Sequence, residues 1–241
     1  MDEQRLALVT GAAGGMGGAT VSRLARDGFR IAAFDIDEAG LKDITESIDC
    51  RSWVVDMTDE EAVRSAVAEV ERDFGAIDAL VNLVGWCETR PFVTEDSAYW
   101  RRVIAINYDA ILFVTHAVLP GMIERQRGRI VNVSSDAGRV GQSGEAVYAG
   151  TKGAVIAFSK SLAREVARYG ITVNCTAPGP TATPLEFAQD PDVISRIIRH
   201  IPFRRMAEPE EQASAIAFLV SDDAKFITGQ TLSVSGGLTM I

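Results

Sequence analysis

Three side chains in the second half of the chain have the types and spacing needed for proton transfer at an alcohol or ketone. Tyr148 and Lys152 lie one helical turn apart in the segment YAGTK, so a helix would point both from the same face. Free tyrosine ionises at about pH 10, and a neighbouring ammonium lowers that pKa. Ser135 follows an apolar run, at the end of a predicted strand, where ligands gather in open α/β sheets. We expect Tyr148 to act as the acid and base, with Lys152 and Ser135 beside it.

Two alternatives to this interpretation stay open at the level of the sequence. A tyrosine and a lysine one turn apart are usually a simple surface contact on a helix, so the pair gains its significance from Ser135. Ser134 is adjacent to Ser135, and one of these two serines is expected only to pack or to cap.

A glycine-rich turn near the N-terminus is suited to binding a dinucleotide phosphate. The segment TGAAGGMG follows an apolar run and opens an amphipathic stretch, which predicts a strand, a turn and a helix in that order. Glycine allows the sharp turn and the close approach of backbone to pyrophosphate, and the helix N-terminus offers free N–H groups. We expect Gly11, Gly15, Met16 and Gly17 to contact the cofactor.

An acidic residue at the end of the second predicted strand favours NAD over NADP. Asp35 lies 24 residues past Gly11, near the spacing at which a carboxylate binds the ribose hydroxyls of NAD. A basic residue would suit the 2′-phosphate of NADP, and Ile36 follows instead. Asp56 and Met57, after the third predicted strand, are expected at the adenine. The segment DMTD is also typical of a helix N-cap, and Asp35 could be a simple solvated acid.

The elements that position these residues alternate between short apolar runs and longer amphipathic stretches, which predicts βαβ units and a parallel sheet. We predict a single domain over residues 1–241, without repeats or linkers. The segment 181–206 has weak periodicity and several prolines, and we interpret it as a mobile excursion that covers the substrate. The predicted strands are 6–10, 30–35, 52–55, 79–84, 129–134, 171–176 and 231–234, and the predicted helices run from the turn to about 27, then over 60–74, 99–125, 147–169 and 210–220.

Composition and charge exclude several other classes of protein. A net charge of −9 argues against a nucleic-acid surface, which needs a basic stripe. No apolar run reaches the ~18–20 residues of a membrane span, and the acidic N-terminus does not resemble a signal peptide. Cys50, Cys87 and Cys175 lie far apart and away from both histidines, so neither a zinc site nor a disulfide is expected. We expect a cytoplasmic protein whose partner is a small molecule.

Together the motifs resemble those of the short-chain dehydrogenases/reductases over essentially the whole chain. The turn is similar to the TGxxxGxG motif of that family, and Ser135, Tyr148 and Lys152 match its Ser…YxxxK. Further matches are Asn107 in the preceding long helix, the Pro178-Gly179 pair, Thr183 and the ending ITGQTLSVSGG.

The resemblance implies a Rossmann-like doubly wound fold, with a seven-stranded parallel sheet between helix layers, and usually a homotetramer. It implies that Tyr148 exchanges the proton with the substrate oxygen and that Ser135 hydrogen-bonds the same oxygen. Lys152 would hold the nicotinamide ribose and lower the pKa of Tyr148, and Asn107 would support a water that relays protons. Further cofactor contacts implied by the family are Asn82, Gly85, Pro178, Gly179, Thr181 and Thr183.

Three positions in two motifs depart from the family pattern. The motif NNAG reads NLVG here, so apolar Leu83 and Val84 replace a polar residue and a small one on the cofactor side. Ser235 stands where the family commonly has an aspartate before two glycines, a change to which we attach no functional weight.

Several segments, among them SSDAGRVGQSGEAVYAGTKGAV, most resemble one branch of the family, the 2-hydroxycyclohexanecarboxyl-CoA dehydrogenase-like enzymes of alicyclic and aromatic acid degradation. This implies NAD-dependent oxidation of a β-hydroxyacyl-CoA to the β-ketoacyl-CoA. Arginines of the covering segment could then bind the CoA phosphates, Arg204 and Arg205 included. The expected substrate contacts are Arg90, Gln142, Gly144, Arg196 and Arg199.

Two other functions are considered. A 3-oxoacyl-carrier-protein reductase would share the fold, although that role usually uses NADPH and Asp35 argues against it. A non-catalytic, cofactor-binding subunit of a hetero-oligomer is supported only by Leu83 and Val84, and the intact catalytic set weighs against it.

Overall fold

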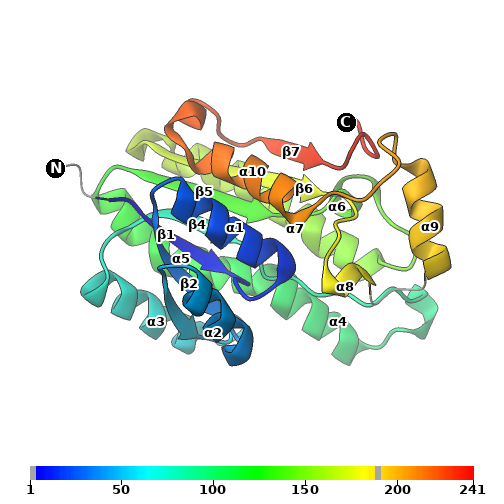
Figure 1. Ribbon diagram of the computed structural model, residues 1–241, viewed down its shortest axis with the longest axis horizontal. Coiled ribbons are helices and arrows are strands. Elements are labelled where there is room, and N and C mark those ends of the chain that lie inside the picture. The colour runs from blue at the N-terminus through cyan, green and yellow to red at the C-terminus, as the bar shows by residue number, and fades with distance from the viewer. Residues whose placement is uncertain (1–3, 188–190) are drawn as a thin grey trace.

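The computed structural model describes residues 4–187 and 191–241, and within them one parallel sheet lies between two layers of helices (Figure 1). The seven strands follow the order β3-β2-β1-β4-β5-β6-β7, and every neighbouring pair is parallel. The chain builds outward from β1 to β3 and then returns to β4 on the other side of β1. This reversal creates the crevice in which open α/β sheets bind ligands. The strands are β1 (Leu6–Thr10), β2 (Arg30–Asp35), β3 (Arg51–Val54), β4 (Ile77–Asn82), β5 (Gly128–Val133), β6 (Ile171–Pro178) and β7 (Thr231–Val234).

Helices α1, α2 and α10 cover one face of the sheet, and α3, α5 and α7 cover the other. The short helices α6, α8 and α9 lie at the carboxyl end of the strands (Figure 1). The helices are α1 (Gly15–Arg26), α2 (Glu38–Ser47), α3 (Glu60–Asp73), α4 (Ser97–Ile104), α5 (Ala110–Glu124), α6 (Ala137–Val140), α7 (Ala146–Val166), α8 (Pro184–Phe187), α9 (Pro191–His200) and α10 (Pro209–Val220).

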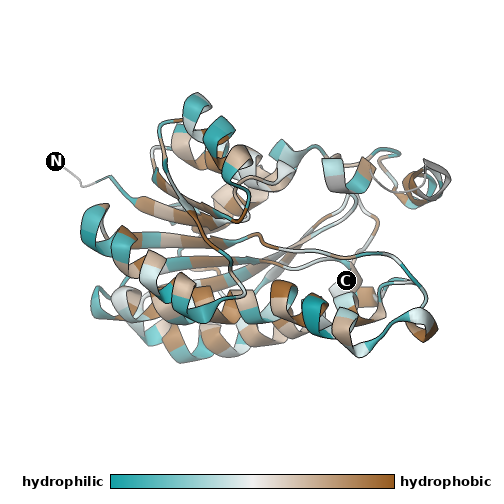
Figure 2. Ribbon diagram, turned by 90° about the horizontal axis from the view of Figure 1, so that it is seen from below, coloured by the Kyte–Doolittle hydropathy of each residue, from teal (hydrophilic) through white to brown (hydrophobic). Residues whose placement is uncertain are grey.

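The central strands are buried on both faces, which explains why they are continuous apolar runs in the sequence. In β1, Leu6 and Leu8 pack in the core beneath α3, α5 and α7, whereas Ala7 and Val9 pack beneath α1 and α10. Hydrophobic residues concentrate on the strands and on the inner sides of the helices, and hydrophilic ones on the outer sides (Figure 2). The fold class predicted from the sequence is therefore confirmed.

The predicted bounds of β1, β2 and β7 agree with the structure, and the other strands differ slightly. Strands β3, β4 and β5 begin and end one or two residues earlier than predicted, and β6 extends to Pro178. Helix α2 was not predicted. Leu41 is buried and Ile44, three residues on, packs against the same core, so the helical spacing is present in the sequence but was overlooked. The start of the helix is fixed by Asp37, whose side chain accepts a hydrogen bond from the Gly40 N–H at 3.2 Å.

The helix predicted over 99–125 is interrupted. Its helical residues form α4, a π-helical turn η2 (Ala105–Asp109) and α5 in direct succession. The stretch Ser97–Glu124 is long and apolar enough by composition to cross a membrane, contrary to the sequence-based expectation. The core helix of a globular fold meets the same test, and here Val114, Val118 and Met122 are fully buried against the sheet.

The segment 181–206 is more regular than its weak periodicity suggested. It contains α8 and α9, and Ile201, directly after α9, is buried. Residues 188–190 of this segment lie outside the described part of the chain.

Candidate active site

The side chains singled out in the sequence converge at the carboxyl ends of the central strands. Asn82 ends β4, Ser135 follows β5 and Pro178 ends β6. Tyr148 and Lys152 lie in the first two turns of α7. This is the edge next to the reversal of strand order, where the α/β fold predicts a ligand.

The glycine-rich turn has the shape that a dinucleotide phosphate requires. Gly11 has φ +68°, and a Cβ there would lie 3.0 Å from the Val84 nitrogen. A Cβ on Gly17 would lie 2.0 Å from the Gly11 carbonyl oxygen, so α1 could not approach the turn. Helix α1 begins without a side-chain cap at Gly14 and without an acidic residue in its first turn, among the described residues. Its first N–H groups are therefore directed toward a binding position for an anion.

The carboxylate of Asp35 is held beside this turn. It accepts hydrogen bonds from the backbone N–H of Ala13 at 2.9 Å and of Asp37 at 3.0 Å. A carboxylate has about four acceptor positions, so capacity remains for ribose hydroxyls. The structure thus presents a fixed negative charge at the place expected for the adenosine ribose.

The environment of Asp56 separates two interpretations that the sequence left open. Asp59 is the N-cap of α3, and its side chain accepts from the N–H groups of Glu61 and Ala62. Asp56 instead accepts from the Thr58 N–H at 2.8 Å and from the Thr58 hydroxyl at 2.7 Å. Asp56 therefore shapes the loop that would meet an adenine and does not cap the helix. Met57 next to it is buried.

The two adjacent serines have different partners. The Ser134 hydroxyl is buried and donates to the backbone oxygen of Lys152 at 2.8 Å, so Ser134 fixes the distance between β5 and α7. Ser135 is partly exposed, and its side chain forms a hydrogen bond with Tyr148. Ser135 is therefore the serine that faces the reacting group.

Lys152 is almost completely buried. Its ammonium donates to the Val133 carbonyl oxygen at 3.0 Å and lies 5.7 Å from the centre of the Tyr148 ring. Burial lowers the pKa of Lys152 to about 8. Because this ammonium is bound to the end of β5, it remains in the site without contacting the phenol directly.

The pKa of Tyr148 differs from the sequence-based expectation. Burial raises it well above its ordinary value, the hydrogen bond with Ser135 lowers it, and the charges of Glu145, Cys87 and Glu186 raise it further. The net shift is therefore opposite in direction to the depression expected from Lys152. The physical reason is that burying a phenolate away from water is costly.

Asn107 lies in the π-helical turn and is completely buried. Its amide donates to the carbonyl oxygens of Trp86 at 2.7 Å and Val103 at 2.9 Å, and its oxygen accepts from the Trp86 N–H at 3.1 Å. A Cβ on Gly85 would lie 3.2 Å from this oxygen and 3.4 Å from the Lys152 ammonium. Glycine at 85 is thus what allows Asn107 and Lys152 to line one space. Single π-helical turns often mark functional sites.

The two apolar residues that depart from the NNAG motif are accommodated by packing in the hydrophobic core. Leu83 and Val84 pack into the cores on opposite faces of the sheet. Asn82 is buried, and its amide donates to Asn132 at 2.8 Å and Thr115 at 3.2 Å. Asn82 therefore links the ends of β4 and β5 beneath the predicted cofactor site.

The segment after β6 closes the site against the glycine-rich turn. A Cβ on Gly179 would lie 2.7 Å from the Cβ of Ser235, and a Cβ on Gly15 would lie 3.0 Å from the Cγ2 of Thr183. The Thr181 hydroxyl donates to the Gly179 oxygen at 3.0 Å. Thr183 thus lies against the first turn of α1, and its contact with a cofactor stays a prediction.

The predicted substrate contacts are brought together only in part. The Arg90 guanidinium lies 3.5 Å from the centre of the Tyr99 ring and forms an ion pair with Glu88 at 3.4 Å. The backbone N–H of Arg90 donates to the carbonyl oxygen of Gly144 at 2.9 Å. Gln142 is exposed on the same loop as Gly144, and Arg196 and Arg199 are exposed on α9.

Two other arginines of the covering segment have partners within the protein. Arg205 forms two hydrogen bonds with the carboxylate of Glu211, at 2.6 and 2.7 Å, and Arg204 donates to the Arg199 carbonyl oxygen. Arg205 is therefore a poor candidate for a phosphate contact.

The sequence analysis missed the ionisable neighbours of Tyr148. Glu145 is three residues before Tyr148, and its side chain accepts from the Thr89 hydroxyl at 3.2 Å. Burial raises the pKa of Glu145. Helical spacing could have identified this residue, because positions three apart share a face. Glu186 on α8 could not have been found, since only the fold brings it near Tyr148.

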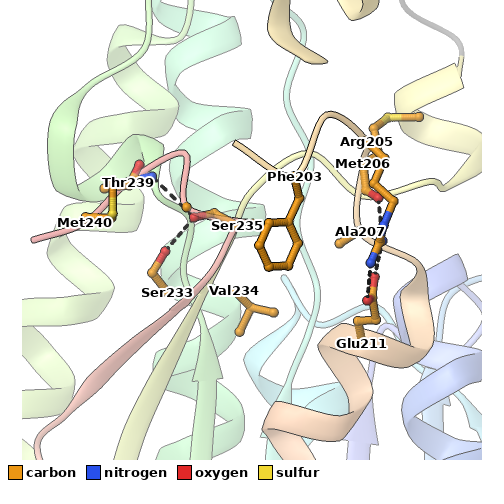
Figure 3. Close-up of a pocket in the computed structure, with 12 residues that line it drawn as sticks. Phe203, Arg205, Met206, Ala207, Glu211, Ser233, Val234, Ser235, Thr239 and Met240 are labelled. Carbon is orange, nitrogen blue, oxygen red and sulfur yellow. Dashed lines mark hydrogen bonds and ion pairs between the residues drawn. The ribbon is translucent and has the colours of Figure 1, made fainter. Parts of the chain in front are cut away.

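A pocket of about 400 Å³ lies beyond the end of β7, between the segment 203–207 and the C-terminal residues (Figure 3). In the described part of the chain, no group of three or more histidine, cysteine or acidic side chains could hold a metal ion. The described cysteines are free thiols, with Cys175 buried and Cys50 and Cys87 half-buried.

Comparisons with known proteins agree with this geometry. Residues 11–239 match the family model described as enoyl-(acyl carrier protein) reductase. The chain is 40% identical to an acetoacetyl-CoA reductase from an Acinetobacter strain over 247 residues, covering 100% of both chains. It is 36% identical to the 3-oxoacyl-(acyl-carrier-protein) reductase of Escherichia coli over 241 residues, covering 99% of both. It is also 40% identical to nodulation protein G of Azospirillum brasilense over 242 residues, covering 98% of both.

Among solved structures, a crystal structure of actinorhodin polyketide ketoreductase with NADPH superimposes with a TM-score of 0.93. It is 32% identical, and the match covers 98% of this chain and 97% of that one. The chain belongs to the short-chain dehydrogenase/reductase family, which confirms the resemblance found in the sequence. It is an oxidoreductase of that kind, with a site for a nucleotide cofactor. The resemblance to the 2-hydroxycyclohexanecarboxyl-CoA branch stays a prediction.

Proposed function

We propose that this protein reduces 3-oxoacyl thioesters to 3-hydroxyacyl thioesters with NADH. The observation that carries the proposal is the convergence of Ser135, Tyr148, Lys152 and Asn107 at the strand ends beside the glycine-rich turn. Relatives named as acetoacetyl-CoA and 3-oxoacyl-carrier-protein reductases support the thioester and the direction. These relatives support the alternative of a 3-oxoacyl thioester reductase better than the oxidation of an alicyclic hydroxyacyl-CoA that the sequence favoured.

The chain's own residues would divide the reaction as follows. A nicotinamide cofactor, when bound, supplies the hydride. Tyr148 donates its phenolic proton to the substrate oxygen, and Ser135 donates a hydrogen bond to the same oxygen. Tyr148, whose pKa is raised by burial, is protonated near neutral pH, as a proton donor must be. Lys152 and Asn107 line the adjacent space, through which the phenolate can regain its proton.

The proposed cofactor is NADH because of Asp35. Two unit charges ~4 Å apart repel by about 4 kcal/mol at an effective dielectric constant of ~20. A 2′-phosphate beside the fixed carboxylate of Asp35 would meet a repulsion of that order, reduced by solvent. The ketoreductase structure contains NADPH, so this property distinguishes the proposal for this chain from that neighbour. A cytoplasmic homo-oligomer is proposed as well.

Reduction of acetoacetyl-CoA, followed by the loss of NADH absorbance, tests the proposal. We expect turnover by the wild type and a loss of ~10²–10⁴-fold in kcat for Tyr148→Phe, with the Kd for NADH unchanged. Tyr169→Phe, far from the site at the end of α7, is the matched control. If Tyr148→Phe retains near wild-type turnover, the assigned mechanism is wrong. A wild type that reduces simple ketones and no acyl thioester would contradict the substrate class.

A further inference from the structure

Asp136, the residue after Ser135, is a buried carboxylate that the reaction proposed above does not use. It is 5% exposed. Both of its oxygens lie 2.9 Å from the Ser233 hydroxyl, and Oδ1 lies 3.9 Å from the guanidinium of Arg139. The Asp136 N–H donates to the Pro178 carbonyl oxygen at 3.1 Å. Because burying a carboxylate is costly unless partners compensate it, this arrangement requires an explanation.

Ser233, which donates to the Asp136 carboxylate, belongs to β7, two strands away from β5. The Ser233 hydroxyl also lies 3.0 Å from that of Ser235, and the Ser235 oxygen accepts from the Thr239 N–H at 3.3 Å (Figure 3). Ser235 stands where the family pattern has an aspartate. The Ser233 hydroxyl therefore joins Asp136 and Ser235 in one network.

The same turn carries Ser135. The Ser135 oxygen accepts from the Ala137 N–H at 3.1 Å, and the Gly138 N–H donates to the Ser135 carbonyl at 3.0 Å. A Cβ on Gly138 would lie 2.6 Å from the carbonyl carbon of Lys152. The turn is therefore confined between α7 on one side and, through Asp136, β7 on the other.

We propose that Asp136 is a positioning residue which, through Ser233, anchors the turn after β5 to β7 and holds the Ser135 hydroxyl at Tyr148. The groups whose charges raise the pKa of Tyr148 are Glu145, Cys87 and Glu186, and the role proposed for Asp136 rests on its contacts. Its influence on catalysis runs through Ser135. The proposal rests on the proposed catalytic role of Ser135, and it is independent of which carbonyl compound is reduced.

A double-mutant cycle between Asp136→Asn and Ser135→Ala separates positioning from a general structural role. Asparagine keeps the shape and replaces one acceptor oxygen with an NH₂ group. We expect Ser135→Ala to lower kcat ~100-fold and Asp136→Asn ~10-fold, with the Kd for NADH unchanged in both. If Asp136 acts through Ser135, the double variant loses about as much as Ser135→Ala alone. Independent effects would multiply to ~1000-fold, and that result would overturn the proposal.

Ser233→Ala, which removes the donor and keeps the carboxylate, is expected to reproduce the loss in kcat. Asp222→Asn, at an exposed site, is the matched control and should leave kcat unchanged. The double-mutant cycle can be measured with any ketone that the wild type reduces. If the wild type is inactive on thioesters, that result refutes the proposed function and leaves the positioning role of Asp136 open to this test. A crystal structure of Asp136→Asn needs no substrate. It is expected to show the Ser135 turn displaced, and an unmoved turn would contradict the positioning role.

Discussion

Replacing Lys152 by methionine is expected to stabilise the fold at neutral pH while it removes activity. The ammonium of Lys152 is buried, and burial lowers its pKa from 10.5 to about 8. The unfolded chain therefore binds the proton more tightly than the native protein does. Methionine has a similar length and no charge, so it removes this penalty and leaves the packing of α7 largely intact.

The size of the effect follows from the pKa values. The gap between 10.5 and about 8 corresponds to about 3 kcal/mol, at ~1.4 kcal/mol for each tenfold change in proton affinity. The hydrogen bond from Lys152 to the Val133 oxygen is lost, which costs about 1 kcal/mol. The net gain at pH ~7 is about 2 kcal/mol, which for a domain of this size raises Tm by roughly 4–8 °C.

The pH dependence of the stability difference shows whether the buried charge of Lys152 causes it. Below about pH 8, Lys152 is protonated in both the folded and the unfolded state, and the full penalty applies to the wild type. Between about pH 8 and 10.5 the native protein loses the proton first, so the stability of the wild type rises relative to Lys152→Met. Above 10.5 the lysine is neutral in both states and the advantage of the variant has gone.

Thermal unfolding of wild type and Lys152→Met over this pH range, followed by circular dichroism, measures the difference directly. Lys160→Met, on the exposed side of the same helix, is the matched control and should change the unfolding free energy by no more than ~0.5 kcal/mol. Activity with NADH should be lost in Lys152→Met and kept in the control. A Lys152→Met protein that is less stable than the wild type at neutral pH, or a difference independent of pH, would refute this reasoning.

Two further predictions concern the cofactor and the acid–base group. The wild type should prefer NADH over NADPH by ~100-fold or more in kcat/KM. Asp35→Asn should reduce that preference at least ~10-fold. Asp37→Asn, which keeps the cap of α2, is the control and should leave the preference unchanged. Equal effects of the two substitutions would remove Asp35 from its assigned role. Glu145→Gln should lower the pKa of Tyr148, because the charge of Glu145 raises it, so the rate of the reverse oxidation should rise at a lower pH than in the wild type. An unchanged pH–rate profile would show that Glu145 does not face the phenol.

The parts of the fold that were predicted well are those determined by local patterns. Strands β1 and β2 are apolar runs bounded by turn residues, and the glycine-rich turn has its own residue pattern. The resemblance to a family then singled out Asn107, Tyr148 and Lys152. In the structure Asn107 and Lys152 line one space beside Gly85, and the Lys152 ammonium lies 5.7 Å from the centre of the Tyr148 ring. Helix α2 was missed although Leu41, Ile44 and Ile48 lie at helical spacing and pack on the core, because the segment is short and mostly polar.

Contacts between distant segments could not be predicted, since they depend on strand order. Nothing in the sequence pairs Asp136 with Ser233, 97 residues away, until β5, β6 and β7 are known to be neighbours. Which of Ser134 and Ser135 faces the site depends on how the end of β5 is placed against α7. The hydrogen bond from the Ser134 hydroxyl to the Lys152 carbonyl oxygen answers that question. The direction of the Tyr148 pKa shift depended on burial, which helical spacing does not reveal.

Burial moves the two central titratable groups of the site toward their neutral forms. The pKa of Tyr148 is raised and that of Lys152 is lowered, so the phenol holds its proton and the ammonium gives its proton up more readily than usual. A phenol that holds its proton so tightly is a weak acid, and general acid–base catalysis is most efficient when the pKa of the group lies near the operating pH. The charges of Glu145 and Glu186 oppose the ionisation of Tyr148 in the same sense as burial does. Substrate and cofactor would therefore have to lower the pKa of Tyr148 on binding for catalysis near neutral pH.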